Sequence, residues 1–501
     1  MAINKLMDKV GNVLFDLTGD TTSENNVAKG VIFHDKYGNQ KVGLGISDDA
    51  SAIAAQPTFF TDNVVFYDYD YSFAYVYTND EAKALTTLPE GKAHDDLNLT
   101  FLGWNFDIKE VNELITHRVY PMYKTSDGIM YIGVEISSDN FTLSINSTYG
   151  NMYVNWGDGT STTQGTSSHT YEKAGTYKIE INSSQKTFSF VSPFSSNNNI
   201  IRYIFLSEYC TSFGSSCLQN ANKYFYMTMH NKIVSIGNSA FSSCYGLSSV
   251  VIPSSVTSIG SSAFSNCYGL SSIVIPSSVT SIPYRAFYYC YGLSSVAIPS
   301  SVTSIGSQAF QSCYGLSSVA IPSSVTSIGN NAFYNCYGLS SVVIPSSVTS
   351  IGNSAFSYCY GLSSVVIPSS VTSIGSEAFY NCSGLSSVVI PSSVTSIGSN
   401  AFSYCYGLSS VVIPSSVTSI GDSAFYNAFF EYMDLTELSE PPIISSVKDV
   451  GYNNPSSPSG SNIPHAPKYF IKPGTLSKYA SATNWSLIYA ERPDLFVEME
   501  I

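Results

Sequence analysis

Residues 336 to 358 read CYGLSSVVIPSSVTSIGNSAFSY, and at Cys359 the same phrase begins again. The phenylalanine of each Ala-Phe pair and the proline of each Ile-Pro pair keep the same step, from Phe241 to Phe425 and from Pro253 to Pro414. The cysteine recurs every 23 residues, at positions 244, 267, 290, 313, 336, 359, 382 and 405. A fixed period of about 20 to 29 residues is typical of a solenoid of leucine-rich turns.

Each repeat predicts two short strands and a corner. Val-x-Ile-Pro predicts a strand that ends at the proline, because proline has no N–H to donate to a ladder. Val-x-x-Ile-Gly predicts a second extended segment closed by glycine, and Ala-Phe-x-x-Cys predicts a helical or 3₁₀ corner. One repeat cannot fold alone, since burying its six apolar side chains recovers less free energy than ordering its backbone costs. The repeats must therefore stack, and the stack needs a cap at each end.

The eight cysteines are predicted to be buried free thiols that act as small hydrophobic groups. In a stack their Cβ atoms point in parallel about one strand spacing apart, whereas a disulfide needs Cβ atoms that approach and face each other. The repeats contain no histidine and no Cys-x-x-Cys pair, which argues against a zinc site.

The charge of the chain is acidic and unevenly distributed. Lys and Arg total 22 against 36 Asp and Glu, a formal charge of −14. This argues against nucleic acid and anionic membranes as partners, because both select basic patches. Between positions 233 and 427 the only charged side chains are Arg285, Glu377 and Asp422, so a charged active site is not expected there. The N-terminus has no secretory signal pattern and no stretch is apolar enough to span a membrane, which indicates a soluble chain made in a cytosol.

Across positions 233–427, the recurring A-F-x-x-C-x-G-L and I-P-S-S-V resemble the BspA-type leucine-rich repeat family. The resemblance implies a surface module for adhesion and recognition. The chain departs from the family in having tyrosine or serine after each cysteine and in lacking the secretion signal of a bacterial surface member. Positions 428–501 resemble the terminal cap of such arrays, with a strand at Tyr469–Ile471 and a short helix at Thr475–Ala482. Positions 188–232 are predicted to form an irregular N-terminal cap.

Two further regions precede the solenoid. In positions 137–187, V-N-W-G-D-G-T and A-G-T-Y-K-I-E-I resemble a PKD-type β-sandwich, with Trp156 in a core strand and Tyr171 and Tyr177 starting later strands. Asp158 is interpreted as a turn-capping residue, with a calcium ligand as the alternative. Positions 57–136 alternate like a β-hairpin and are predicted to be a small β-rich domain. A helix is expected at Thr78–Leu85, with Thr78 or Asn79 as its N-cap.

The first fifty residues suggest a setting for the protein. D-L-T-G-D-T, K-G and H-D-K-Y-G resemble the N-terminal segment of tail-associated proteins in phages of gut bacteria. The resemblance implies that positions 1–50 anchor the chain to a virion. The predicted fold is mainly β: small N-terminal β or α-β modules and a PKD-like β-sandwich, followed by a capped leucine-rich repeat solenoid.

Three functions are compared. The first is a phage virion protein of the tail-fibre or receptor-binding type, assembled in the host cytoplasm, that recognises the bacterial host surface. The alternative is a BspA-like adhesin on a bacterial surface. An enzyme acting on surface glycans is disfavoured, because the paired acids Asp68, Asp70, Asp95 and Asp96 read as solvated turn residues rather than as a catalytic pair. No catalytic, cofactor or metal residues are predicted.

The expected partners are other tail proteins for the N-terminal region and a bacterial surface polysaccharide or protein for the repeats. Neither nucleic acid nor membrane insertion is expected, and a homo-oligomer is left open.

Two faces of the rod are candidates for binding. One is the stripe formed by the middle residue of each Val-x-Ile segment, which is Val251, Val274, Ala297, Ala320, Val343, Val366, Val389 and Val412. The other is the corner, where tyrosines gather and could stack on uncharged sugars or contact a protein. The alternative is that these tyrosines only stack on one another. The candidate ligand-binding residues are Tyr288, Tyr289, Tyr334, Tyr337, Tyr358, Tyr360, Tyr380, Tyr404 and Tyr406.

Overall fold

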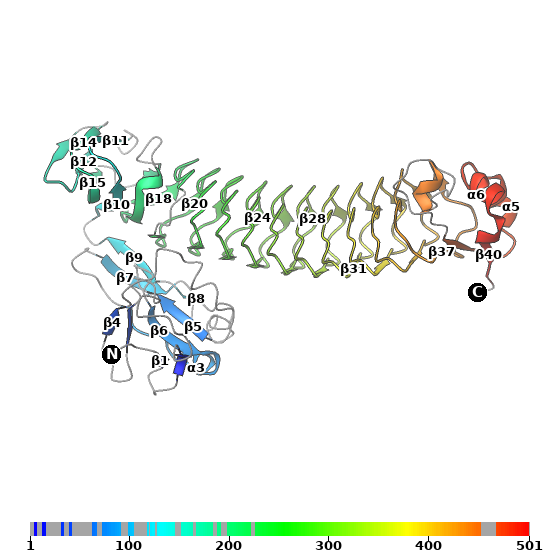
Figure 1. The fold of residues 1–501 in the computed structure, drawn as a ribbon, viewed down its shortest axis with the longest axis horizontal. Coiled ribbons are helices and arrows are strands. Elements are labelled where there is room, and N and C mark those ends of the chain that lie inside the picture. The colour runs from blue at the N-terminus through cyan, green and yellow to red at the C-terminus, as the bar shows by residue number, and fades with distance from the viewer. Residues whose placement is uncertain are drawn as a thin grey trace.

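The computed structural model describes the repeats and their flanks almost without gaps and the first 125 residues in part. The described residues are 5–7, 13–16, 32–34, 40–42, 63–67, 73–91, 99–104, 118–119, 121–125, 128–145, 152–163, 167–183, 188–191, 198–221, 226–451 and 467–499. Within them the fold is mainly β, as the sequence predicts. The repeats form a long rod with other elements gathered at its two ends (Figure 1).

A first parallel ladder runs the length of the rod with one strand per turn, giving twelve turns. The ladder is interrupted between β22 and β24. In most turns the N–H of a glycine donates to the preceding turn, as Gly306 N–H donates to Ile282 O at 2.8 Å. Pro283 occupies this glycine position in its turn and has no N–H to donate. The strands of the ladder are β16 (Phe188–Phe190), β18 (Cys210–Phe213), β20 (Ser235–Ile236), β22 (Ser258–Ile259), β24 (Ser281–Ile282), β26 (Ser304–Ile305), β28 (Ser327–Ile328), β30 (Ser350–Ile351), β32 (Ser373–Ile374), β34 (Ser396–Ile397), β36 (Ser419–Ile420) and β38 (Ile443–Ile444).

A second set of parallel strands lies on another side of each turn. Within the repeats each of these strands ends just before the Ile-Pro pair, which confirms the predicted role of proline. The strands are β17 (Ile201–Phe205), β19 (Tyr226–Thr228), β21 (Ser249–Val251), β23 (Ser272–Val274), β25 (Ser295–Ala297), β27 (Ser318–Ala320), β29 (Ser341–Val343), β31 (Ser364–Val366), β33 (Ser387–Val389), β35 (Ser410–Val412), β37 (Tyr432–Leu435), β39 (Lys468–Ile471) and β40 (Phe496–Glu498).

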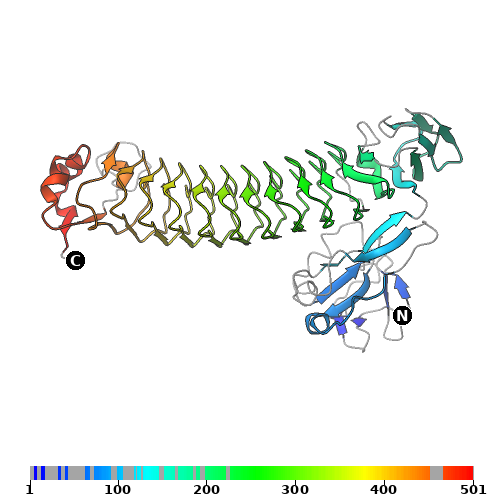
Figure 2. The ribbon, with the colours of Figure 1, turned by 180° about the vertical axis from the view of Figure 1, so that it is seen from behind.

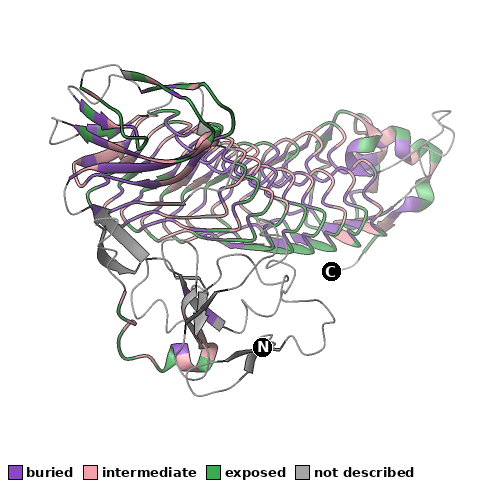
Figure 3. Ribbon diagram, turned by 60° about the vertical axis from the view of Figure 1, so that its left-hand side comes forward, coloured by how far each residue is buried: buried purple, intermediate pink, exposed green. Residues whose placement is uncertain are grey.

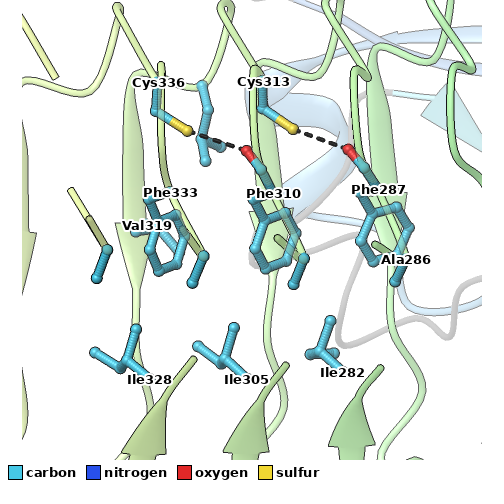
Figure 4. Close-up of a cluster of buried hydrophobic side chains, with 14 of the residues drawn as sticks. Ile282, Ala286, Phe287, Ile305, Phe310, Cys313, Val319, Ile328, Phe333 and Cys336 are labelled. Carbon is cyan, nitrogen blue, oxygen red and sulfur yellow. Dashed lines mark hydrogen bonds between the residues drawn. The ribbon is translucent and has the colours of Figure 1, made fainter. Parts of the chain in front are cut away.

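The interior of the rod consists of identical side chains stacked turn upon turn. Phe287, Phe310 and Phe333 lie face to face with ring centroids 5.3 and 5.4 Å apart (Figure 4). Each repeat cysteine is buried and free, and the Cys336 thiol donates to the carbonyl of Phe310 at 3.2 Å. The predicted buried free thiols are therefore confirmed, and each also makes a hydrogen bond that the sequence did not reveal. Figure 3 shows the buried residues lining the inside of the coil and the exposed residues on its outside.

The corner is not the predicted helix or 3₁₀ turn. It is a run of tight turns in which every second N–H bonds within the turn, as from Ser357 to Ser354 O at 3.2 Å. The N–H groups between them bond to the next turn, as from Tyr358 to Tyr380 O at 2.7 Å. This alternation requires left-handed residues twice per corner, here Ser354 and Tyr358 at φ 54° and 60°. The inter-turn bonds satisfy backbone groups that a short helix would leave free.

The N-terminal end of the rod is closed by an antiparallel sheet. Its central strand β10 (Met130–Ile136) pairs on one side with β15 (Gly175–Ser183) and on the other with β17 of the solenoid. The buried core therefore runs without a break from this sheet through the whole rod. The predicted boundary at 136/137 falls at the end of β10, and the division into domains stays a prediction.

The remaining strands here are β11 (Phe141–Ile145), β12 (Met152–Asn155), β13 (Ser161–Thr163) and β14 (Ser167–Tyr171), and a 3₁₀ turn, η4, spans Asn198–Ile200. Trp156 is fully buried just after β12. Tyr171 ends β14 rather than starting a strand, whereas Tyr177 lies near the start of β15.

The C-terminal cap covers the last turn with helices α5 (Leu476–Ser481) and α6 (Trp485–Glu491) and 3₁₀ turns η5 (Val447–Val450) and η6 (Pro493–Leu495). The predicted strand and short helix are both present, as β39 and α5. The cap also holds a fully buried carboxylate, Asp449. Its oxygens accept from the N–H of Ser423, 2.7 Å away, and from the N–H and hydroxyl groups of Ser445 and Ser446 at 2.6 to 2.9 Å.

A separate lobe lies beside the first turns of the rod (Figures 1 and 2). The predicted hairpin is present as β5 and β6, and the predicted helix as α3, whose N-cap Thr78 forms a capping box with Glu81. Within the described residues no helix has the length and apolar character needed to cross a bilayer. The elements of the lobe are β1 (Lys5–Met7), β2 (Val13–Asp16), β3 (Ile32–His34), β4 (Gln40–Val42), β5 (Asn63–Tyr67), β6 (Phe73–Thr78), α3 (Asn79–Lys83), β7 (Leu99–Trp104), β8 (Arg118–Val119) and β9 (Pro121–Thr125).

Candidate ligand-binding surface

Three positions of each corner carry the candidate tyrosines. The first and second corner positions are the two residues before the cysteine, and the third is the residue after it. We call the nine predicted tyrosines at these positions the tyrosine surface. Tyr288, Tyr334 and Tyr380 occupy first positions, Tyr289, Tyr358 and Tyr404 second positions, and Tyr337, Tyr360 and Tyr406 third positions. The fold places all nine along one edge of the rod, each at least partly exposed to solvent.

The third-position tyrosines form a continuous stack from Tyr245 to Tyr360. Neighbouring ring centroids lie 4.6 to 4.9 Å apart, with planes 1° to 19° from parallel. The rings therefore cover one another's faces and present edges and hydroxyls to solvent. For Tyr337 and Tyr360 this is the arrangement that the stacking alternative expected. Ser383 interrupts the column in the next turn.

The first and second positions form a different pattern, a zigzag of edge-to-face contacts. Its rings are 5.2 to 5.6 Å apart and inclined by 63° to 85° to one another, an arrangement that aromatic quadrupoles favour. The zigzag runs through Tyr334, Tyr358, Tyr380, Tyr404 and Tyr426. It continues past Ser383, so the tyrosine surface is not broken there.

The zigzag arises because the corner sequence alternates between turns. Tyr-Asn occupies the first and second positions at 334–335, 380–381 and 426–427, whereas Ser-Tyr occupies them at 357–358 and 403–404. In the Ser-Tyr turns the serine is buried, and Ser403 Oγ donates to the carbonyl of Tyr426 at 3.0 Å. The ring thus moves from one side of the corner to the other, and the surface repeats every two turns. This signal was present in the sequence, but reading each repeat singly missed it.

Tyr358 and Tyr404 are oriented differently from the stacked column beside them. Tyr358 is inclined by 85° to Tyr360, and Tyr404 by 77° to Tyr406. Because the stacked rings, Tyr360 among them, face each other along the rod, the plane of Tyr358 runs parallel to the rod. Tyr358 and Tyr404 are both half-buried, and both have left-handed backbones with φ of 60° and 61°.

The tyrosine surface carries few charges, and in its middle burial, helped by the charge of Glu377, raises the pKa of Tyr334 and Tyr380. Burial is the main cause that raises the pKa of the phenols of Tyr334, Tyr360 and Tyr406, so these groups keep their protons at neutral pH. At its N-terminal end Arg285 lies over the ring of Tyr288, 4.7 Å from the centroid, and Tyr288 contacts Tyr289 at 4.1 Å. The guanidinium also donates from Nε to Gln308 Oε1 at 2.8 Å.

The second candidate face, the valine stripe, is exposed along the middle of the rod. The exposed fraction of Val343 is 72%, and Val366 and Val389 are similarly exposed. Closer to the N-terminus Val274 packs against the buried core of the lobe, around Val64 and Phe66. The stripe is therefore partly used in contacts within the chain.

Of the other polar candidates, Asp158 lies in the described part of the chain. Asp158 Oδ1 accepts from the N–H and hydroxyl of Thr160 at 3.0 and 2.7 Å, and Oδ2 lies 2.6 Å from His169 Nε2. These contacts make Asp158 a turn-capping residue, as interpreted. Asp68, Asp70, Asp95 and Asp96 lie outside the described residues. In the part of the chain that the structure describes, no group of three potential metal ligands comes together.

Comparison with known proteins identifies the repeats. The model of the BspA type leucine rich repeat region matches residues 164–294, 211–340 and 326–446, with six copies. Among curated proteins no sequence relative was found.

Similar solved structures include a leucine-rich repeat protein from Bacteroides ovatus (29% identity, TM-score 0.41, 51% of this chain and 63% of that one). They also include the T. pallidum leucine-rich repeat protein (25%, 0.31, 41% and 83%) and a leucine-rich cell surface protein from Faecalibacterium prausnitzii (25%, 0.36, 60% and 94%).

Proposed function

This chain belongs to the BspA-type leucine-rich repeat family, and on that basis we propose that it is a cell-surface adhesion and recognition protein that binds its ligand non-covalently. The stacked rod is the rigid scaffold, and the tyrosine surface makes the contact. The observation that carries the proposal is the zigzag of mutually packed tyrosines along one edge of a rod whose repeats hold only three charged side chains.

Packed tyrosines suit binding for two reasons. Each ring offers a large amphipathic contact area with few rotatable bonds, so little entropy is lost when a ligand docks. The neighbouring rings already hold Tyr358 and Tyr380 in place, with centroids 5.2 Å apart, so much of that ordering cost is met before binding. Binding rather than catalysis is proposed, because these phenols remain protonated and the described residues of the surface include no nucleophile paired with a base.

The test uses side chains that the protein itself places at equivalent positions. The triple variant Tyr334→Ser, Tyr358→Asn and Tyr380→Ser introduces at each corner the residue type found in an adjacent turn, namely Ser357 and Asn335. The turns therefore keep their backbone conformation. Binding of the labelled chain to a panel of intact bacteria should fall at least tenfold, while the circular dichroism spectrum and unfolding midpoint stay close to those of the wild type.

The matched control removes three exposed residues from the other face, with Val343→Ser, Val366→Ser and Val389→Ser. This variant should bind as the wild type does. Undiminished binding by the tyrosine variant, or an equal loss in both variants, would refute the tyrosine surface as the contact.

A phage virion appendage is the second candidate. The N-terminal D-L-T-G-D-T and H-D-K-Y-G resemblance favours it, with the N-terminal region joining tail proteins and the same tyrosine surface meeting the host. The comparisons support a surface adhesin better, since the family match lies in the repeats. Copurification of the chain with intact phage particles would support the virion role, and its recovery from washed bacterial envelopes without particles would support the adhesin.

A further inference from the structure

The tyrosine surface has the regularity of a polymer rather than that of a folded protein. Its rings recur at each turn from Tyr334 to Tyr426, and the pattern repeats every second turn. A globular protein partner without internal repeats would engage only a few of these equivalent positions. A ligand built from identical units in a straight line would meet the same contact again and again.

Resting on the proposed function, we infer that the ligand is an extended, neutral polysaccharide of β-1,4-linked pyranoses that lies along the rod. It places one sugar over each turn, and Tyr358 and Tyr404 stack against every second sugar. The flat apolar face of such a sugar points its C–H groups at the electron-rich face of the ring, the geometry that the aromatic quadrupole favours.

The step of the rod fits this ligand. Between ring centroids, consecutive turns are 4.6 to 4.9 Å apart at the stacked tyrosines and 5.2 to 5.7 Å apart at the stacked phenylalanines. An extended β-1,4-linked chain advances by about the length of one pyranose per sugar and turns alternate sugars over, so it repeats every second sugar. The alternation of Tyr-Asn and Ser-Tyr corners gives the protein the same two-unit repeat.

The orientation of two rings also fits. The plane of Tyr358 runs along the rod, nearly perpendicular to the stacked ring of Tyr360, and Tyr404 is inclined by 77° to Tyr406. A ring plane that runs along the rod is the orientation that stacking against a sugar chain along the rod requires. The stacked third-position rings cover one another and offer hydroxyls instead, which suits them to hydrogen-bond the sugar edges.

The backbone supplies an independent argument. The second corner position is left-handed in every repeat, and asparagine occupies it in the turns of Asn335 and Asn381 at φ 60° and 54°. Asparagine tolerates this conformation better than a bulky residue does. Tyrosine at 358 and 404 is therefore placed there at a cost to stability, which is typical of residues retained for function.

The experiment measures binding of the full chain to soluble hexasaccharides by isothermal titration calorimetry. The probes are β-1,4-linked hexamers of glucose, mannose and N-acetylglucosamine, with the α-1,4-linked glucose hexamer as the linkage control. At least one β-linked hexamer should bind, and at least tenfold more tightly than its dimer because more stacking positions are engaged. The α-linked hexamer curves away from the rod and should not bind.

The double variant Tyr358→Asn and Tyr404→Asn should lose at least tenfold in affinity for the β-linked hexamer, whereas Val366→Ser with Val412→Ser should lose none. Equal affinity for α- and β-linked hexamers would overturn the inference. So would the absence of binding to every β-linked probe by a chain that still adheres to cells through its tyrosines. In that last case the proposed surface recognition would stand and the polysaccharide would be replaced by another ligand.

Discussion

The left-handed residues of the corner decide which side chains the rod tolerates there. Asn381 has φ of 54° in a turn that must close without a helix. Asn381→Ala should lower the free energy of unfolding by about 1–2 kcal/mol, because a Cβ without a compensating polar group is disfavoured in this conformation. Asn381→Gly should cost less, since glycine adopts it freely. Guanidinium titration of both variants checks this, and a glycine variant as unstable as the alanine variant would contradict it.

The buried cysteines predict an alkaline limit to stability. Burial raises the pKa of Cys336 and Cys382 to about 12, whereas the pKa of an unfolded thiol is ~8.5. The folded rod keeps these thiols protonated, whereas the unfolded chain loses their protons above a pH of ~8.5. The free energy of unfolding is therefore unaffected by these thiols below the unfolded pKa, and it declines as the pH rises from that value toward the pKa of the folded state. Each thiol should remove about 1.4 kcal/mol per pH unit across that window.

Chemical unfolding at pH 7, 9 and 10 measures this slope. The variant Cys336→Ala has one thiol fewer and should show a shallower decline, although its stability at pH 7 is lower because it loses the bond to Phe310 and leaves a small cavity. Native protein at pH 8 should react with a thiol reagent only after denaturant is added. Rapid labelling of the folded chain, or equal slopes for both proteins, would show that the thiols are not sealed in the core.

At the scale of elements, the caps determine whether the ends of the ladder survive. In the corner before the last regular one, the N–H of Asn400 donates to the carbonyl of Asp422 in the next turn. The equivalent N–H in the last regular corner is that of Ser423, and no regular corner follows it. The side chain of Asp449 takes the place of the next corner by accepting the Ser423 N–H, and the backbone carbonyl of Asp449 accepts from the N–H of Phe425 at 3.3 Å. Asp449→Asn puts an amide NH₂ against these donors and should destabilise the cap by about 3 kcal/mol.

Hydrogen exchange resolves this effect by position. Because each turn contacts only its neighbours, exchange should rise over residues 419–451 and stay unchanged around β28. The control Asp422→Asn changes an exposed acid of the same corner and should leave exchange as it is. Uniformly faster exchange along the rod would contradict the idea of a local cap.

Most elements of the rod could be predicted from its sequence, because period, proline and glycine act locally. The strands ending before proline, the buried cysteines, and β39 and α5 of the cap all follow from residue type and spacing. The corner could not, since its bonds run between turns 23 residues apart and its left-handed residues are not glycines. The union of β10 with β17 was also hidden, because no local pattern marks which strand pairs with the first turn.

The candidate site was only half accessible to sequence analysis. The tyrosines and their edge of the rod could be named from the repeat. Their two arrangements could not be predicted. The tyrosine shifts by one residue between Tyr-Asn and Ser-Tyr corners, and only in the stacked turns does this shift incline the ring of Tyr404 by 69° to that of Tyr380. Asp449 gave no signal at all, since its five donors are assembled by the fold of the cap.

For the whole molecule, the two-turn repeat predicts that binding and stability depend on the number of turns in different ways. Stability depends on how many turns remain, whereas binding depends on whether Tyr-Asn and Ser-Tyr corners still alternate. Deleting 341–363 removes one turn and brings the Tyr-Asn corner of 334–335 next to that of 380–381. Deleting 341–386 removes two turns and leaves 334–335 followed by the Ser-Tyr corner of 403–404, so the alternation survives. Both deletions rejoin serines in the same strand position, and both rods should fold, with stability declining with the number of turns lost.

Binding should not follow that order. The shorter rod with two turns removed keeps the zigzag and should retain affinity for a repeating ligand within a few fold. The longer rod with one turn removed places two first-position rings side by side, which breaks the two-unit match, and should bind more weakly. Thermal unfolding and binding to the same bacteria or hexasaccharides measure the two properties on one set of proteins. If affinity simply tracked the number of remaining tyrosines, the alternation would be an accident of repeat history and individual rings, rather than their spacing, would determine recognition.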